Sequence, residues 1–206
     1  MRATAIASLC CALFLVTPSR SSASTITVDF ESIPDSTPIR ELYSSLGIHF
    51  VRATAITAGI SLNEFEFPPH SGEDVVFDNS GNIIVDFDNP VSSVSGYFTY
   101  AQPITLTAFG TNGLSLGTVS SHYFTNDAFF GDPGSSPNEL LGLQFSLGIA
   151  RVSITGSVLG SSFTMDDFSF SAPSDTVPEP SAAVLMLIGI ASLLVTRFSE
   201  VRRSKV

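Results

Sequence analysis

The chain has 206 residues, of which 44% are hydrophobic and only 14% are charged, and its formal net charge is −10. Residues 24–176 contain 17 acidic residues, three arginines and no lysine, which gives this segment a formal charge of −14. Because phosphate binding requires positive charge, nucleic acid is excluded as a partner. A segment of this length is an ordinary size for one domain with its own hydrophobic core.

The first 23 residues have the organisation of a secretory signal peptide. Arg2 supplies a positive start, residues 3–16 are mostly apolar, and small residues lead to a predicted signal-peptidase cleavage between Ala23 and Ser24. Both cysteines of the chain lie inside this segment. The exported chain is therefore expected to contain no disulfide and no thiolate metal ligand, so its core, alone or with a metal ion, must stabilise it.

Residues 24–170 are predicted to form an all-β domain. β-branched and aromatic residues alternate with other residues in short segments, a period of two that is typical of half-buried strands. The segments with this pattern are 26–30, 83–88, 94–100, 104–108 and 152–154. Turn-forming residues separate them at 78–82, 88–90, 110–113 and 131–134. Short strands with turns at this spacing predict a β-sandwich or jelly roll.

Two local features depart from the strand pattern. Residues 38–46 predict one or two helical turns, with Pro38 in the first turn and Gly47 just after the last. Near the end of the domain, the hydrophobic parity at 163–165 differs from that at 168–170. A β-bulge at Asp166 and Asp167 would reconcile the two parities, because a bulge inserts one extra residue into a strand.

Three segments follow the domain in order. A polar linker at 171–177 ends in a short motif with two prolines, which favour an exposed, extended backbone. Residues 181–196 contain no charge, and as a helix they would span roughly 24 Å, slightly less than the ~30 Å hydrocarbon core of a bilayer. The motif consists of Val177, Pro178, Glu179 and Pro180, and the basic tail at 197–206 contains Arg197, Arg202, Arg203 and Lys205.

Together, the motif, the apolar run and the basic end resemble a PEP-CTERM sorting signal, which would occupy residues 178–206. The resemblance implies that an exosortase, a membrane-embedded transpeptidase, processes the chain near the motif. The single transmembrane helix would then hold the chain in the inner membrane only transiently, with its basic tail inside. The alternative is an ordinary single-pass anchor, in which the proline motif is only a linker beside the membrane.

A second resemblance concerns the domain itself. The segments ITVDFESI, LYSSLGIHF, LLGLQFSLGIARVSITG and FTMDDFSF are similar to jelly-roll domains of PEP-CTERM proteins, which resemble galactose-binding-like and carbohydrate-binding modules. This resemblance implies that the first and last strands lie close together and that an acid from each holds a structural calcium ion. The matching residues are Glu31 and Asp166 or Asp167. The alternative is that these acids are surface charges that protect a sheet edge.

Other side chains give weaker signals for chemistry. His49, His70 and His122 lack the spacing of a metal or catalytic motif, so we interpret them as surface residues. No two of the 17 acids stand out as the carboxylate pair of a glycosidase. Phe129 and Phe130 lie in a loop-like stretch, either as an exposed apolar lip or as part of the core.

The sequence thus predicts a non-enzymatic exported protein. After exosortase sorting it would lie at the cell surface or in the extracellular matrix, where its β-sandwich would serve adhesion or contact exopolysaccharide. One alternative is a secreted glycan hydrolase that uses carboxylates on a sheet face. Another is a permanently anchored membrane protein with an external binding domain.

Overall fold

The computed structural model describes residues 24–171 together with residue 186. The predicted signal peptide, sorting motif and basic tail lie outside the described residues, as does the apolar run apart from Met186. Among the described residues, no helix has both the length and the apolar character needed to cross a membrane.

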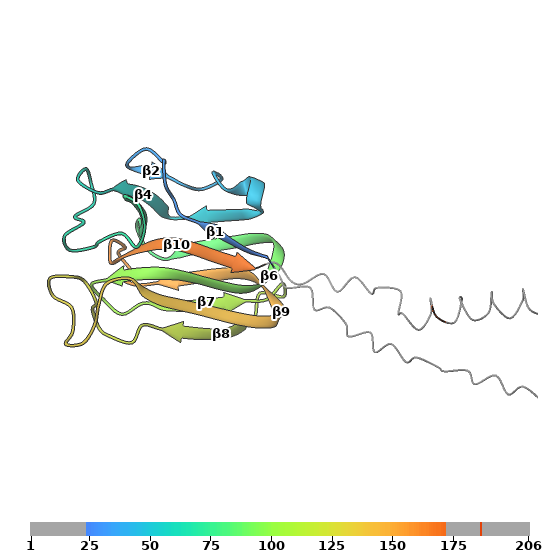
Figure 1. The fold of residues 1–206 in the computed structure, drawn as a ribbon. Helices are drawn as coiled ribbons and strands as arrows, with labels where there is room; N and C mark the ends of the chain where they lie inside the picture. Colours follow the sequence, from blue (N-terminus) through green and yellow to red (C-terminus); the bar gives the residue numbers. More distant parts are fainter. Residues whose placement is uncertain (1–23, 172–185, 187–206) are drawn as a thin grey trace, which may run out of the picture. The chain divides into compact units, whose positions relative to one another are not determined.

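Residues 24–171 form ten β-strands and one short 3-10 helix, so the prediction of an all-β domain is confirmed (Figure 1). The elements are β1 (Thr25–Val28), β2 (Thr37–Pro38), η1 (Ser44–Leu46), β3 (Ile48–Val51), β4 (Ala53–Thr57), β5 (Asp74–Asp78), β6 (Ile83–Tyr100), β7 (Thr105–Phe109), β8 (Ser115–Ser120), β9 (Glu139–Thr155) and β10 (Phe163–Ser171).

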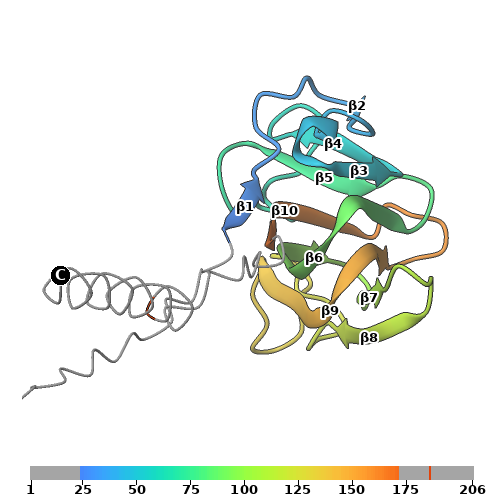
Figure 2. The same ribbon diagram turned by 90° about the vertical axis from the view of Figure 1, so that its right-hand side faces the viewer.

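The strands belong to one antiparallel sheet with the order β2-β4-β5-β10-β6-β9-β7-β8. Two further pairs complete it, β1 with β10 and β3 with β6 (Figure 2). The pairing of β1 with β10 confirms that the first and last strands lie side by side. Figure 1 shows β10 and β6 in the middle of the stack, with β2 and β4 at one edge and β8 at the other.

The two longest strands, β6 and β9, pair with each other and join the β5 and β10 side of the sheet to the β7 and β8 side. Their register shifts between Asp86 and Val91 and again before Ser93, and such irregularities let a strand bend. The bend brings β3 opposite β10, where the rings of Phe50 and Phe168 meet edge to face with centroids 5.9 Å apart. The sheet therefore folds over on itself and encloses its core as a sandwich does.

The core is apolar, and its buried polar groups are paired. Its largest fully buried side chains include Phe30, Phe98, Phe163 and Phe168. Among the described residues, every buried side-chain nitrogen or oxygen has a hydrogen-bond partner. An apolar interior of this kind is the main source of stability for a domain without disulfides.

Two details differ from the sequence-based expectation. The predicted helix at 38–46 is reduced to η1, because Pro38 belongs to β2 and the next N–H, that of Ile39, donates to the carbonyl of Ala53. Gly47 does end the helical turn, with a left-handed φ of 74°. The predicted turn at 88–90 is instead the bent part of β6, because pairing on both sides continues the strand through it.

The predicted bulge in the last strand is confirmed. The register between β10 and β6 shifts between Asp166 and Ser169, and Asp167 has a φ of 46°. The extra residue lets Met165 and Phe168 both face the core, where both are fully buried. The same bulge turns the two aspartates toward the loop before β5.

Candidate binding site

A row of three side chains crosses neighbouring strands on the outer face of the sheet. Thr54 of β4 lies opposite Phe77 of β5, and Phe77 lies opposite Thr164 of β10. Facing residues on adjacent strands point to the same side. Ala55 and Val76, one position along, belong to the buried core. The row therefore lies on the side of the sheet that faces away from the core.

The long loop at 58–73 forms a wall beside this row. Its first turn is fixed at the end of β4, where the carbonyl of Thr57 accepts the N–H groups of Ser61 and Leu62. Leu62 is buried and anchors the loop. Further along, the side-chain amide of Asn138 donates to the carbonyl of Pro68 at 3.1 Å. The wall is thus fixed at both ends by hydrogen bonds.

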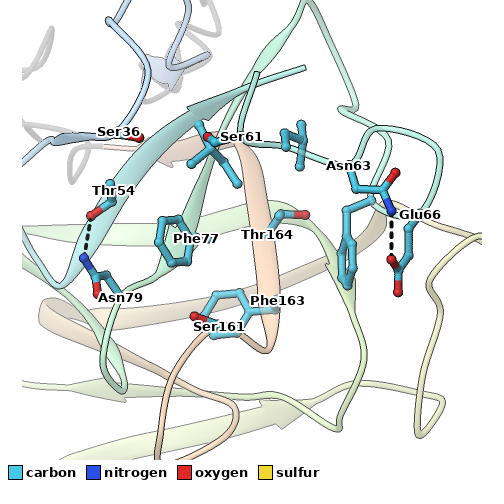
Figure 3. A pocket seen from close by; sticks show the side chains of 13 residues that line it. Ser36, Thr54, Ser61, Asn63, Glu66, Phe77, Asn79, Ser161, Phe163 and Thr164 are labelled. Atoms are coloured by element: carbon cyan, nitrogen blue, oxygen red, sulfur yellow. Dashed lines mark hydrogen bonds between the residues drawn. The ribbon is translucent and has the colours of Figure 1, made fainter. Parts of the chain in front are cut away.

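The row and the wall enclose a cavity of about 500 Å³. Figure 3 shows the ring of Phe77 in the cavity, with Thr54 on one side and Thr164 on the other. The amide of Asn79 donates to the hydroxyl of Thr54 at 3.2 Å, and the amide of Asn63 donates to Glu66 at 3.0 Å.

The lining combines aromatic rings with neutral hydrogen-bonding groups. Hydroxyl and amide groups come from serines, threonines and asparagines, and none of the lining residues within 24–171 is a lysine, arginine or histidine. Glu66 is the one carboxylate among the described residues that line the cavity. The aromatic and polar lining residues are Phe67, Phe77, Phe163, Ser36, Thr54, Ser61, Asn63, Asn79, Ser161 and Thr164.

The acids that were expected to hold calcium all accept hydrogen bonds from the loop segment 70–74. Asp166 is 1% exposed, and one of its oxygens accepts the N–H groups of His70 and Ser71, each at 2.8 Å. Burial raises the pKa of Asp166 to about 6, although these hydrogen bonds favour its charged form. Asp167 accepts the hydroxyl of Ser71 and pairs with the ring of His70 at 2.6 Å.

On the first-strand side, Glu31 follows β1 and holds the same loop. One of its oxygens accepts the N–H groups of Glu73 and Asp74, each at 3.1 Å. Within residues 24–171, no three or more acidic, histidine or cysteine side chains are grouped as a metal site requires. Calcium binding by Glu31, Asp166 and Asp167 therefore stays a prediction. The structure places these acids at the two sides of the 70–74 segment, which they fasten to both end strands.

Each of the three histidines pairs with a carboxylate. His49 lies between Glu41 and Asp88, at 2.5 and 2.9 Å, and these two hydrogen bonds raise its pKa. His122 pairs with Glu139 at 2.9 Å. His70, besides its bond to Asp167, stacks on Tyr97 with ring centroids 3.4 Å apart. These pairs could not be predicted from local spacing, because most of the partners lie far away along the chain.

Phe129 and Phe130 form the exposed lip that was one of two expectations for them. They are 57% and 74% exposed. Asp127 fixes their backbone, because one of its oxygens accepts both N–H groups, at 3.0 and 2.6 Å. The adjacent N–H of Ala128 donates to the carbonyl of Glu66, a residue of the cavity lining. The lip thus lies next to the wall of the cavity.

Sequence reasoning missed the cavity itself. Phe77 lies in the short apolar segment Val75-Val76-Phe77. Because all three residues are apolar, their pattern does not show which of them face the core. The loop at 58–73 has no motif that predicts a wall. The available signal was the length of this loop, because long loops within compact domains often have a function.

Comparisons with known proteins found no matching family model and no matching curated protein. Several solved structures align with this chain at low similarity. The K2 cleaved adhesin domain of Lys-gingipain matches with a TM-score of 0.45 and 13% identity, over 71% of this chain and 99% of that one. A carbohydrate-binding module of family 29 matches with a TM-score of 0.39 and 9% identity, over 76% and 95%. The CBM22-1 xylan-binding domain from Paenibacillus barcinonensis Xyn10C matches with a TM-score of 0.39 and 10% identity, over 75% and 98%. Identities and TM-scores at this level transfer no residue role to this chain.

Proposed function

We propose that this protein is an exported glycan-binding protein, and that the cavity on the outer face of β4, β5 and β10 holds part of a neutral sugar chain. The observation that carries the proposal is the row of Thr54, Phe77 and Thr164 beside a wall of fixed hydroxyl and amide groups. Sugar rings present apolar C–H faces and hydroxyl edges. An aromatic ring complements the faces, and neutral donors and acceptors complement the edges.

The absence of positive charge from the lining favours a neutral sugar over a phosphorylated ligand, because phosphate recognition relies on arginine, lysine or a helix N-terminus. The cavity is open on the outer face of the sheet, and the exposed lip of Phe129 and Phe130 extends its apolar surface beyond Glu66. A chain longer than the cavity could therefore continue over the lip. Extended contact of this kind suits a polysaccharide of a surface layer or matrix.

Phe77→Ala is expected to weaken binding of a glycan that the full-length chain selects from an array of neutral oligosaccharides. Removing the ring eliminates an aromatic contact, and we expect an affinity loss of about tenfold. Affinities are measured by calorimetry beside thermal melts, which show that the variant folds. Asn63→Ala, at an exposed position of the wall, should also weaken binding with little change in melting temperature.

Phe124→Ala is the matched control, because Phe124 is 62% exposed and lies outside the cavity lining. It should leave the affinity unchanged. Equal losses in Phe77→Ala and Phe124→Ala, or an array on which no neutral glycan binds, would contradict the proposed site.

We further propose that the chain reaches this glycan by export and sorting. The signal peptide, the PEP-CTERM-like motif around Glu179 and the short apolar run behind it support this route. Signal peptidase would remove residues 1–23, and an exosortase would process the chain near Pro178-Glu179-Pro180. The mature protein would then leave the inner membrane for the cell surface or matrix.

Mass spectrometry of the protein recovered from cells tests this route directly. We expect a C-terminus near Pro178-Glu179-Pro180 and loss of the tail that contains Arg202 and Arg203. A Glu179→Ala variant should retain the tail, because the motif would no longer be recognised. Recovery of the wild-type chain with its tail intact in the inner membrane would identify a permanent anchor instead.

A further inference from the structure

Two of the three arginines in the described domain lie at a second cavity, next to the first. This cavity has a volume of about 450 Å³, and Arg40 and Arg52 are both among its lining residues. Thr54 and Asn79 line both cavities. Their hydrogen bond of 3.2 Å therefore lies between the first cavity and a second one that contains positive charge. A single ligand chain that passes over Thr54 and Asn79 would contact both cavities.

The backbone holds both arginines in uncommon conformations. Arg52 lies in the bend between β3 and β4 with a φ of 61°, and its carbonyl accepts the N–H of Asn79 at 2.8 Å. Arg40 has a φ of 26°, and its carbonyl accepts the N–H of Phe50 at 2.9 Å. Non-glycine residues at positive φ cost free energy, and they persist where the surrounding structure holds them, often at binding sites. Hydrogen bonds from Phe50 of β3 and from Asn79, just after β5, thus fix the backbone from which each arginine side chain extends.

Neither guanidinium group has a hydrogen bond or an ion pair within the part of the chain that the structure describes. The third arginine differs, because Arg151 donates two hydrogen bonds to Asp86 at 2.5 and 3.0 Å. The one acid that lines the second cavity, Glu41, already pairs with His49 at 2.5 Å. In a domain with such an excess of acids, two unpaired arginines at one cavity leave their donors free for an anionic ligand.

We propose that the second cavity binds the carboxylate of an acidic sugar residue, a uronate, in a polysaccharide whose neutral part lies in the first cavity. Guanidinium groups match the geometry of carboxylates and form charge-assisted hydrogen bonds with them. The identification of the ligand as a glycan rests on the proposed function. The strongly acidic remainder of the domain repels a densely charged polyanion. The polymer that fits therefore carries isolated acidic residues between neutral ones.

The test uses one oligosaccharide in two charge states. Aldopentauronic acid, a pentasaccharide with a single uronate carboxylate, and its methyl ester are titrated into the full-length chain by calorimetry. The free acid is expected to bind at least about tenfold more tightly than the ester, since hydrogen bonds to charged groups are the stronger ones. Arg40→Gln and Arg52→Gln should each remove most of this preference, because they weaken binding of the acid more than binding of the ester.

Arg151→Gln is the matched control, because it removes the same charge at a paired site elsewhere on the domain. The preference for the acid should survive in this variant. Equal binding of acid and ester by the wild type, no binding of the acid, or an equal loss in Arg151→Gln would overturn the proposal.

Phe77→Ala separates this proposal from the proposed function. A loss of affinity for acid and ester alike supports sugar binding in the first cavity, whatever the arginine variants do. If Phe77→Ala changes neither affinity while Arg40→Gln and Arg52→Gln abolish the preference, the uronate site is supported and sugar binding in the first cavity is contradicted.

Discussion

Gly160→Ala is expected to destabilise the domain by about 3 kcal/mol or more, from the combined cost of a left-handed backbone and overpacking. Gly160 lies in the turn before β10 with a φ of 81°. A Cβ there would lie 2.5 Å from both the carbonyl oxygen of Asp78 and the backbone nitrogen of Ser80. These are backbone atoms, so no side-chain rotation relieves the overlap. Chemical denaturation of the purified full-length variant measures the loss.

Gly113→Ala is the matched control for the backbone conformation. Gly113 has a φ of 73° in the turn between β7 and β8, and no atom lies within 4 Å of where its Cβ would be. Its loss should be only about 1–2 kcal/mol, the cost of the left-handed conformation alone. Equal losses at the two positions would mean that the turn at 157–162 does not pack against residues 78–81 as described.

The domain is expected to lose stability as the pH rises from about 4 to 6, through Asp166. Burial raises the pKa of this carboxyl to about 6 from 3.8, so in this interval the folded state binds more protons than the unfolded state. The free energy of unfolding therefore falls with rising pH, by up to about 3 kcal/mol from this group alone. Asp166→Asn should remove this part of the pH dependence, as thermal melts across the interval would show.

Asp35→Asn is the control with the opposite sign. Hydrogen bonds from Ser61 and from the backbone N–H of Thr57 lower the pKa of Asp35. Its contribution is present at neutral pH and is lost as the pH falls through the lowered pKa. An Asp166→Asn profile parallel to that of the wild type would contradict the raised pKa of Asp166.

The same melts test the predicted calcium ion. A metal bound to Asp166 requires the ionised carboxylate, so calcium would make stability rise with pH and a chelator would reverse the trend. If Glu31, Asp166 and Asp167 serve only as acceptors for the 70–74 segment, a chelator leaves the melting temperature unchanged at every pH.

The sequence was most informative where a local pattern decides the structure. The alternation of apolar residues predicted the strands, and the change of parity around Asp166 predicted the bulge, because a core-facing residue must be apolar wherever it falls. Gly47 likewise marked the end of a helical turn. Each of these predictions depended on neighbours within a few residues.

Features that depend on pairing between distant segments were not predictable in the same way. The row of Thr54, Phe77 and Thr164 arises from three strands whose order is a property of the whole sheet. Pro38 entered a strand because Ile39 bonds the carbonyl of Ala53, so tertiary pairing overrode a local helical preference. The charge count showed that residues 24–176 contain only three arginines, but not that two of these three adjoin one cavity.

The position of β10 has a mechanical consequence. Its last residues are bonded on both sides, since residues 168–171 pair with β1 and residues 169–171 pair with β6. A force applied at Ser171 along the strand loads both ladders in shear, so several hydrogen bonds must break together before the chain extends. An attachment at this end would transmit tension directly into the middle of the sheet, and resistance to such a load depends on the rate of unfolding rather than on equilibrium stability.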